Sequence, residues 1–295
     1  MNSVLVLLCS IVLTAWLTLA FKVIKKFDVN NLQAIVYNYI SCVITGSLFN
    51  GSFPVIASRH EEWFPWAMFM GACFITLFNL VAFVAQKNGV AVASVVYKLS
   101  LVIPFLFAVF FYKEPASLLK IGGIVLALLA VLFTSWPSKQ NRSASGNAPV
   151  ILLILMPLLL FIGSGLLDTM IKYVEQEFMN AENQNDYLIS AFASAAAIGI
   201  ILLVFGYSTG KLQFSWKAVV AGISIGVPNY FSIWFMVKAL KAFANNSSMV
   251  IPVNNMGIVL FNTIIAWVFF KEKLSALNWI GILLSMAAIA FIAYG

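Results

Sequence analysis

Long apolar runs follow one another along the whole chain, and short polar connections separate them. About 20 consecutive apolar residues in a helix cross the roughly 30 Å hydrocarbon core of a bilayer, so each run has the length of a membrane span. The runs are continuously apolar rather than alternating, which favours helices over the strands of a barrel. The pattern predicts ten spans, at about 3–22, 32–50, 65–86, 91–112, 117–136, 149–172, 187–206, 216–238, 247–270 and 276–294.

The composition supports this interpretation. Of the 295 residues, 62% are hydrophobic and 9% are charged, and the mean hydropathy is +0.99. A water-soluble domain carries about 25% charged residues. The net charge of +7 comes from Lys and Arg spread over short connections, which is usual beside membrane spans and does not indicate nucleic-acid binding. We therefore expect a multi-pass protein of a plasma (inner) membrane.

The chain offers little material for a metal site or a catalytic centre. It has one histidine, His60, in a connection, and its three cysteines lie inside apolar runs, where cysteine behaves as a small hydrophobic residue. An intramembrane enzyme needs a nucleophile, a base and a stabilising group within hydrogen-bond reach. Aspartate occurs only at positions 28, 168 and 186, and no such set is visible. We expect no metal, no cofactor and no enzymatic activity.

Two segments, one in each half of the chain, repeat each other. The sequence FYKEPASLL at 111–119 recurs as FFKEKLSAL at 269–277. A Gly-Ile pair follows each copy, beginning at Gly123 and at Gly281. One such match could arise by chance among apolar sequences, so further matches in the same order are needed to indicate a duplication.

Those further matches lie upstream. Trp66 and Asn79 have counterparts in Trp216 and Asn229, between the corresponding pairs of expected spans. A Ser/Asn-rich connection near the midpoint separates the two copies. The predicted organisation is a first five-helix repeat at 1–137, a linker at 138–147 and a second five-helix repeat at 148–295.

Each copy contains an odd number of expected spans, so the second copy must enter the membrane from the opposite side. Inverted repeats of this kind occur in secondary transporters, where the halves move about a binding site near the midplane. We therefore predict an all-α integral membrane protein with ten transmembrane helices arranged as two inverted five-helix repeats. The predicted function is transport by alternating access.

A five-span unit that ends in a Lys-Glu turn and a Gly-Ile helix, present twice, resembles the drug/metabolite transporter superfamily, and more narrowly its ten-helix EamA-type carriers. The resemblance implies alternating-access carriage through a central cavity between the halves, by proton coupling or by exchange, with substrates from amino acids to sugar nucleotides. The first copy departs from the family at Ala15-Trp16-Leu17. The matching residues are Lys113-Glu114-Pro115 with Gly122-Gly123-Ile124, Lys271-Glu272-Lys273-Leu274 with Gly281-Ile282, and Gly163-Ser164-Gly165.

Lys98 is the sharpest candidate for a binding residue. It lies in the fourth expected span, about 12 Å deep at 1.5 Å per helical residue. A lysine at that depth snorkels to the interface, pairs with an acid, or faces a watery cavity and binds an anion. The resemblance adds weight to the last role, because branches of the superfamily that carry phosphate- and nucleotide-linked substrates use basic residues on central helices.

Other polar side chains gather on the second, third, eighth and ninth expected spans. Burying them in hydrocarbon is costly, so they are binding candidates. The alternative is hydrogen bonding between helices, worth about 0.6–2 kcal/mol per contact. Asn254 and Asn255 are adjacent, so only one can face a given cavity squarely, and they follow Pro252, which frees a backbone carbonyl. The substrate-binding candidates are Lys98, Asn79, Asn229, Tyr230, Asn254, Asn255, Tyr37 and Asn38.

Asp168 is the one aspartate inside an apolar run. Lys172 follows one helical turn later, so the two side chains can form an ion pair near the interface. Small multidrug carriers of the superfamily that this chain resembles use an acidic residue on the first helix of the unit. Asp168 lies on the corresponding helix of the second copy. Asp168 is therefore either half of an interfacial ion pair or a proton-coupling residue.

Several residues have a structural interpretation instead. Gly222 and Gly226 form a small-xxx-small pair, which lets two helices approach closely in a membrane. The stripe Ala191, Ala195 and Gly199 predicts the same. Glu114 and Glu272 lie at the edges of connections, and we expect them to cap a helix or to pair with a charge rather than to bind substrate.

Together these residues favour a carrier of a small polar metabolite, amino acid-like, organic-anion or zwitterionic, whose negative group docks at Lys98. The alternatives are a channel or a non-transporting scaffold, although a channel usually shows a repeated filter or a ring of charge. The expected partners are the substrate and the lipid bilayer, and a monomer is compatible with the sequence. Basic residues are more numerous in the odd-numbered connections, which would place both termini outside, whereas the resemblance implies both inside.

Overall fold

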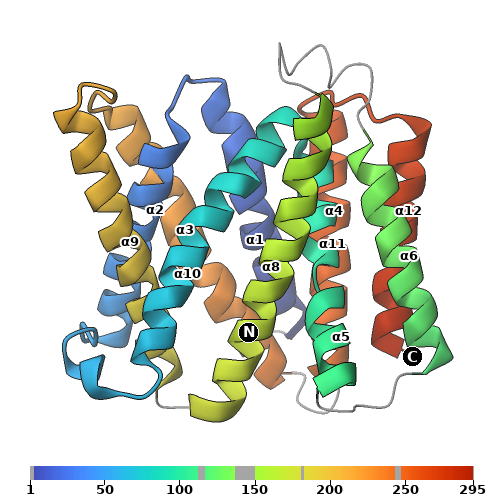
Figure 1. Ribbon diagram of the computed structural model, residues 1–295, viewed down its shortest axis with the longest axis horizontal. Helices are drawn as coiled ribbons and strands as arrows, with labels where there is room; N and C mark the ends of the chain where they lie inside the picture. Colours follow the sequence, from blue (N-terminus) through green and yellow to red (C-terminus); the bar gives the residue numbers. More distant parts are fainter. Residues whose placement is uncertain (1–2, 112–116, 137–149, 181–182, 243–246, 295) are drawn as a thin grey trace. The chain divides into compact units, whose positions relative to one another are not determined.

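The computed structural model describes residues 3–111, 117–136, 150–180, 183–242 and 247–294. Within these ranges the chain is helical and contains no strand (Figure 1). The helices are α1 (Ser3–Lys25), α2 (Asn31–Asn50), the short 3-10 helix η1 (Ala57–His60), α3 (Phe64–Lys87), α4 (Val90–Leu99), α5 (Val102–Phe111), α6 (Leu118–Ser135), α8 (Val150–Phe178), α9 (Gln184–Ser208), α10 (Trp216–Ala242), α11 (Ser247–Val268) and α12 (Ala276–Tyr294).

These helices lie on the apolar runs of the sequence. Seven helical stretches of the described chain have the length and apolarity to cross a bilayer, and three more are apolar but shorter, at Leu118–Thr134, Val253–Val268 and Ala276–Ile292. The protein is therefore an all-helical, multi-pass membrane protein in its described part. Ten crossings and inverted repeats stay predictions. The linker at 138–147 and the segment Lys113-Glu114-Pro115 lie outside the described residues.

The chain forms two compact units, and each contains segments from both halves of the sequence. Unit 1 comprises Met1–Lys22, Leu80–Thr169 and Phe231–Gly295, and unit 2 comprises Val23–Asn79 and Met170–Tyr230. The helices α1, α3, α8 and α10 contribute residues to both units.

Helix α4 is the buried centre of unit 1. Apolar side chains all around this short helix are shielded, including Val92 at 2% exposed and Leu99 at 0%. A helix that is apolar on every face needs neighbours on every face. In unit 1 these neighbours include α6, α11 and α12.

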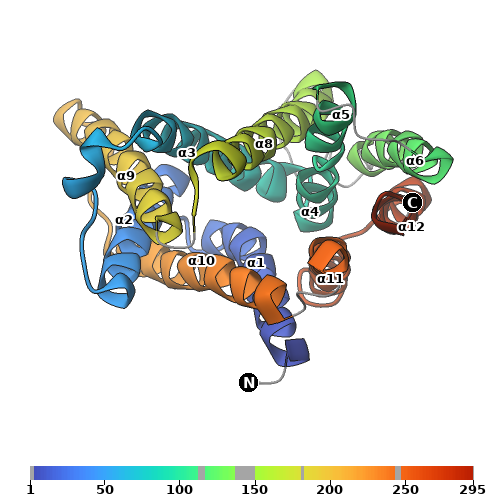
Figure 2. The ribbon, with the colours of Figure 1, turned by 90° about the horizontal axis from the view of Figure 1, so that it is seen from below.

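Helices α6 and α12 pack side by side in unit 1 through the two glycines of the repeated Gly-Ile pairs (Figures 1 and 2). A Cβ at Gly123, early in α6, would lie 3.1 Å from the carbonyl oxygen of Ala288, late in α12. A Cβ at Gly281, early in α12, would lie 3.0 Å from the carbonyl oxygen of Ala130, late in α6. The start of each helix therefore meets the end of the other, and the two helices run antiparallel.

Unit 2 contains a second pair with the same reciprocal pattern. A Cβ at Gly199, late in α9, would lie 2.5 Å from Cγ2 of Val36, early in α2. A Cβ at Gly46, late in α2, would lie 3.0 Å from Cγ1 of Ile189, early in α9. Helices α2 and α9 are thus also antiparallel neighbours.

The small-xxx-small pair on α10, Gly222 and Gly226, allows a neighbouring helix to approach closely, as the sequence predicts. A Cβ at Gly222 would lie 2.9 Å from the carbonyl oxygen of Ala34, and one at Gly226 would lie 2.6 Å from Cβ of Ser41. Both contacts bring α10 against α2 in unit 2, at a separation that only glycine allows. The prediction of close helix approach at this pair is confirmed.

Candidate functional site

The fourth expected span is interrupted where it was predicted to be one helix. Helix α4 ends at Leu99, a turn occupies Ser100 and Leu101, and α5 begins at Val102. Pro104 explains the interruption, because proline has no N–H to donate to the carbonyl of Ser100 and its ring crowds that carbonyl. The Ser100 carbonyl instead accepts a shorter-range hydrogen bond from the N–H of Ile103, at 2.9 Å. A membrane helix with such an interruption leaves polar backbone available for a ligand or ion.

A charged cluster lies at this interruption, within unit 1. Lys98 is in the last turn of α4, and its ammonium lies 4.7 Å from the centroid of the Tyr97 ring. Asp168, on α8, interacts electrostatically with Lys98. The hydroxyl of Ser100 lies 2.6 Å from the carbonyl oxygen of Tyr97 and 3.4 Å from Oδ2 of Asp168, so it can donate to either.

The two charges of this cluster are neighbours without direct contact. Lys98 and Asp168 are both half-buried and keep accessible surface. Lys22 and Glu272 form a direct ion pair, whereas Lys98 and Asp168 do not. Opposite charges inside a membrane protein stabilise each other. This arrangement leaves donor capacity on the Lys98 ammonium and acceptor capacity on the Asp168 carboxylate.

Close packing of α8 against α5 brings Asp168 to the cluster. Gly165, one turn before Asp168, has no side chain, and a Cβ there would lie 2.6 Å from Cβ of Ile103. Asp168 is therefore held near the interruption by a helix contact that glycine permits.

The structure bears on the three roles that the sequence leaves open for Lys98. An acid, Asp168, lies beside it, although the local sequence gives Asp168 a different possible partner in Lys172. The side chain of Lys172, the alternative partner of Asp168, lies outside the described residues. The proximity of residues 98 and 168 depends on how α4, α5 and α8 pack. The spacing of residues along one helix does not predict it.

The asparagines of α11 are buried in unit 1. Asn254 is 5% exposed and Asn255 is 8% exposed, and Oδ1 of Asn254 has no hydrogen-bond partner within the described chain. Asn262, which the sequence analysis did not single out, is fully buried and its amide donates to Oγ of Ser94 on α4, at 2.5 Å. Asn262 lies in an apolar run just as Asn254 does, so the sequence marked it equally as a candidate binding residue.

A second polar cluster lies in unit 2, between α2 and α10. The amide of Asn229 donates to Oδ1 of Asn38 at 3.2 Å, and both side chains are buried. The thiol of Cys42 donates to the carbonyl oxygen of Gly226 at 3.3 Å. The amide nitrogen of Asn38 has no hydrogen-bond partner among the described residues. The contact of Asn38 with Asn229 is the helix-bridging hydrogen bond that was the alternative to substrate binding.

Of three further candidates in unit 2, Asn79 bonds to its own helix, Tyr230 packs against α2 and Tyr37 packs against α10. The Asn79 amide donates to the carbonyl oxygen of Ile75 on its own helix, at 2.8 Å. The Tyr230 ring is buried and packs edge-on against Phe49 at 6.2 Å. Tyr37 is half-buried on α2, one residue before Asn38. These contacts favour roles in packing.

The candidates thus fall into two sets. Lys98, Asn254, Asn255 and the proton-coupling candidate Asp168 belong to unit 1, where Tyr97 lies beside Lys98 and the structure adds Ser100 and Asn262. Tyr37, Asn38, Asn79, Asn229 and Tyr230 belong to unit 2. One site that combines both sets stays a prediction. Among the described residues no group of three or more His, Cys, Asp and Glu side chains could hold a metal ion.

Comparison with known proteins adds a relative and a shared fold. No family model matches the chain. An uncharacterized protein of Haemophilus influenzae is 27% identical over 298 residues, and the alignment covers 99% of this chain and 97% of that protein. A protein of known crystal structure is similar with a TM-score of 0.59 and 15% identity, over 98% of both chains. At this identity the structural likeness shows that the fold is shared.

Proposed function

We propose that the protein is a secondary transporter, similar to the EamA-type carriers of the drug/metabolite transporter superfamily. It moves a small zwitterionic, amino acid-like metabolite across a plasma membrane by alternating access between two inverted five-helix repeats. The observation that carries the proposal is the reciprocal antiparallel packing of α6 with α12 and of α2 with α9.

That packing supports inversion because the paired helices occupy equivalent places in the sequence repeats. Helices α6 and α12 are the fifth of each copy and carry the matching glycines, Gly123 and Gly281. Helices α2 and α9 are the second of each copy. If the copies ran in the same direction, equivalent helices would be parallel. Antiparallel equivalents, each meeting its partner start to end, are what an inverted duplication produces, and inverted repeats are typical of alternating-access carriers.

The charged cluster of unit 1 supports a substrate site there. Lys98 and Asp168 are neighbours of opposite charge without direct contact, at an interrupted membrane helix. Ionisable groups inside a membrane protein usually mark a substrate or ion pathway. A pair that only stabilised the fold would be expected to close into direct contact, since the low-polarity surroundings strengthen the attraction.

The same two charges favour a zwitterion over a simple organic anion. A substrate carboxylate at Lys98 would be repelled by Asp168 unless the substrate carried a cation as well. An amino acid-like zwitterion offers both charges, its carboxylate for Lys98 and its ammonium for Asp168. The Tyr97 ring beside Lys98 would contact the apolar part of the substrate. The unpartnered Oδ1 of Asn254, on the same unit, is an acceptor for a polar remainder.

Counterflow tests the proposal. Purified protein in liposomes preloaded with one unlabelled amino acid should accumulate the labelled form transiently, and the uptake should saturate. Substrates can first be chosen from a thermal-shift screen of amino acids, their des-amino acids and dicarboxylates, since a ligand at 100 times its Kd stabilises by about 2.7 kcal/mol. Non-saturable flux without counterflow would indicate a channel. No flux of any screened ligand would leave a scaffold as the better description.

A further inference from the structure

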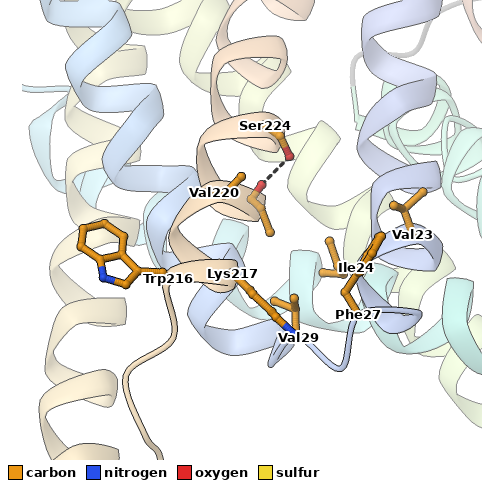
Figure 3. A pocket seen from close by; sticks show the side chains of 9 residues that line it. Val23, Ile24, Phe27, Val29, Trp216, Lys217, Val220 and Ser224 are labelled. Carbon is orange, nitrogen blue, oxygen red and sulfur yellow. Dashed lines mark hydrogen bonds between the residues drawn. The ribbon is translucent and has the colours of Figure 1, made fainter.

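An apolar groove lies in unit 2, where the end of α1 meets the start of α10. Its volume is about 430 Å³, and its walls come from the last residues of α1, from the connection to α2 and from the first turns of α10. Val23 and Ile24 lie on one side and Val220 on the other (Figure 3). A volume of this size is within the range of ligand pockets, roughly 300–1,000 Å³.

The groove has one ionisable group among its lining residues, Lys217. Its side chain extends from the first turn of α10 toward Val29 (Figure 3). Lys217 has no ion pair in the part of the chain that the structure describes. The other polar lining residue, Ser224, donates its hydroxyl to the carbonyl oxygen of Ala221 at 2.8 Å. The groove therefore presents an apolar trough with a single free positive charge.

This groove lies at the end of membrane spans. Lys25 and Lys26 follow Ile24 directly, and the apolar span of α10 begins at Trp216. Tryptophan and lysine at such positions mark the headgroup level of a bilayer. The amide of Gln33 donates to the carbonyl oxygen of Gln213 at 2.8 Å, which fixes the connection before α10 against the start of α2.

The apolar walls are strongly exposed. Trp216 is 72% exposed, Val220 64% and Phe27 59%. Exposed apolar surface of this kind marks contact with a membrane or a ligand. In a multi-pass membrane protein the surrounding solvent at this level is lipid, whose acyl chains match these walls and whose phosphate matches Lys217.

We propose that this groove is a binding site for an anionic phospholipid. One acyl chain lies between the end of α1 and the start of α10, and the phosphate is held by the ammonium of Lys217, the ionisable residue that lines the groove. Basic pockets between transmembrane helices are suited to anionic headgroups. The site lies wholly in unit 2 and does not depend on the charged cluster of unit 1.

Native mass spectrometry of the purified full chain tests the site, with phosphatidylglycerol and phosphatidylcholine that carry identical acyl chains. The protein should retain phosphatidylglycerol in preference to phosphatidylcholine. Lys217→Met should lower retention of phosphatidylglycerol about fivefold, the factor expected for one lysine near a membrane surface. Lys211→Met is the matched control, because Lys211 lies in the connection just before α10 and does not line the groove, and it should leave the preference intact.

A substitution that fills the groove tests whether the acyl chain of the lipid is bound there, in addition to the headgroup. Val220→Phe places a ring between the walls and should lower retention of both lipids. Ile223→Phe adds the same ring on α10 at a residue that is 50% exposed and does not line the groove, and it should have no effect. Equal retention of the two lipids, or no effect of Lys217→Met, would overturn the anionic site. Equal binding of glycerol phosphate without chains, or no effect of Val220→Phe in a folded protein, would overturn the lipid groove.

Discussion

The carboxylate of Glu272 lies 3.0 Å from the ammonium of Lys22, in a partly buried ion pair. The same carboxylate oxygen accepts a hydrogen bond from the N–H of Val90, at 3.1 Å, and so caps the first turn of α4. The position of Glu272 at the edge of a connection predicts a helix cap or an ion pair, and in the structure its carboxylate forms both. The connection between α11 and α12 thereby holds the end of α1 and the start of α4 together within unit 1.

Glu272→Gln should lower the thermal stability of the protein. Glutamine can still accept from the Val90 N–H, but it removes the charge that faces Lys22, and hydrogen bonds to charged groups contribute about 1.5–3 kcal/mol. Partial exposure of Lys22 places the expected loss at the low end of that range. The measurement is the Tm of the detergent-purified protein beside Glu62→Gln, an exposed glutamate in another connection. Equal Tm values for the two variants would show that the pair contributes nothing.

Gly89→Ala should destabilise the protein more than Gly210→Ala. Both glycines have positive φ, +111° and +69°, so alanine is strained at either. Only at Gly89 would the new Cβ also meet a neighbour, Oε2 of Glu272 at 2.7 Å, whereas nothing lies within 4 Å at Gly210. Thermal unfolding of the two variants gives the comparison. A Gly210→Ala protein that is the less stable of the two would refute the tight contact between Gly89 and Glu272.

Gly226→Ala should loosen the contact between α10 and α2. Its Cβ would overlap the backbone of Asn38, and forcing extra atoms into a packed contact costs about 1–3 kcal/mol. Gly122→Ala is the control, because it lies in helix α6 with nothing within 4 Å, and alanine there should be neutral or stabilising. Melting curves of both variants decide the matter. Equal stability would mean that α10 and α2 lie further apart than described.

Local sequence pattern predicted what local chemistry controls. The apolar runs became helices, Gly222 and Gly226 allowed close packing, and Glu272 at the edge of a connection became a cap and an ion pair. The prediction of one span at 91–112 overlooked Pro104, which is a sequence signal for the interruption after Leu99.

Contacts between segments far apart in the chain could not be predicted from the sequence. The proximity of Lys98 to Asp168 depends on how α8 packs against α5, and nothing near either residue encodes its partner. The same holds for the asparagines. Asn38 and Asn229 bond to each other across two helices, while Asn79 bonds to its own helix, yet all three look alike as polar residues in apolar runs. A polar residue at membrane depth indicates that a hydrogen-bond partner exists, but a single sequence does not identify that partner.

Asp168→Asn should discriminate between the two charges of the substrate. If Asp168 receives the substrate ammonium, the variant should bind a zwitterionic substrate at least about tenfold more weakly, the factor of a charged hydrogen bond. It should bind the des-amino acid, which has only the carboxylate, as well as or better than the natural protein. Thermal-shift titration with the two ligands measures this. If Asp168 instead carries only the coupled proton, both ligands should keep their affinity while a pH gradient no longer drives uptake.

The role of Lys98 is tested most directly by counterflow of the substrate in liposomes with Lys98→Met. Methionine keeps much of the apolar stem and removes the charge, so a substrate carboxylate loses its counter-ion at the interruption between α4 and α5. Lys238→Met is the matched control, since Lys238 also lies over an aromatic ring, that of Trp234 at 4.5 Å, but is exposed. We predict that Lys98→Met lowers initial uptake by at least about tenfold, with Lys238→Met unchanged. Undiminished rate and affinity in a folded Lys98→Met protein would contradict the assignment of the substrate site.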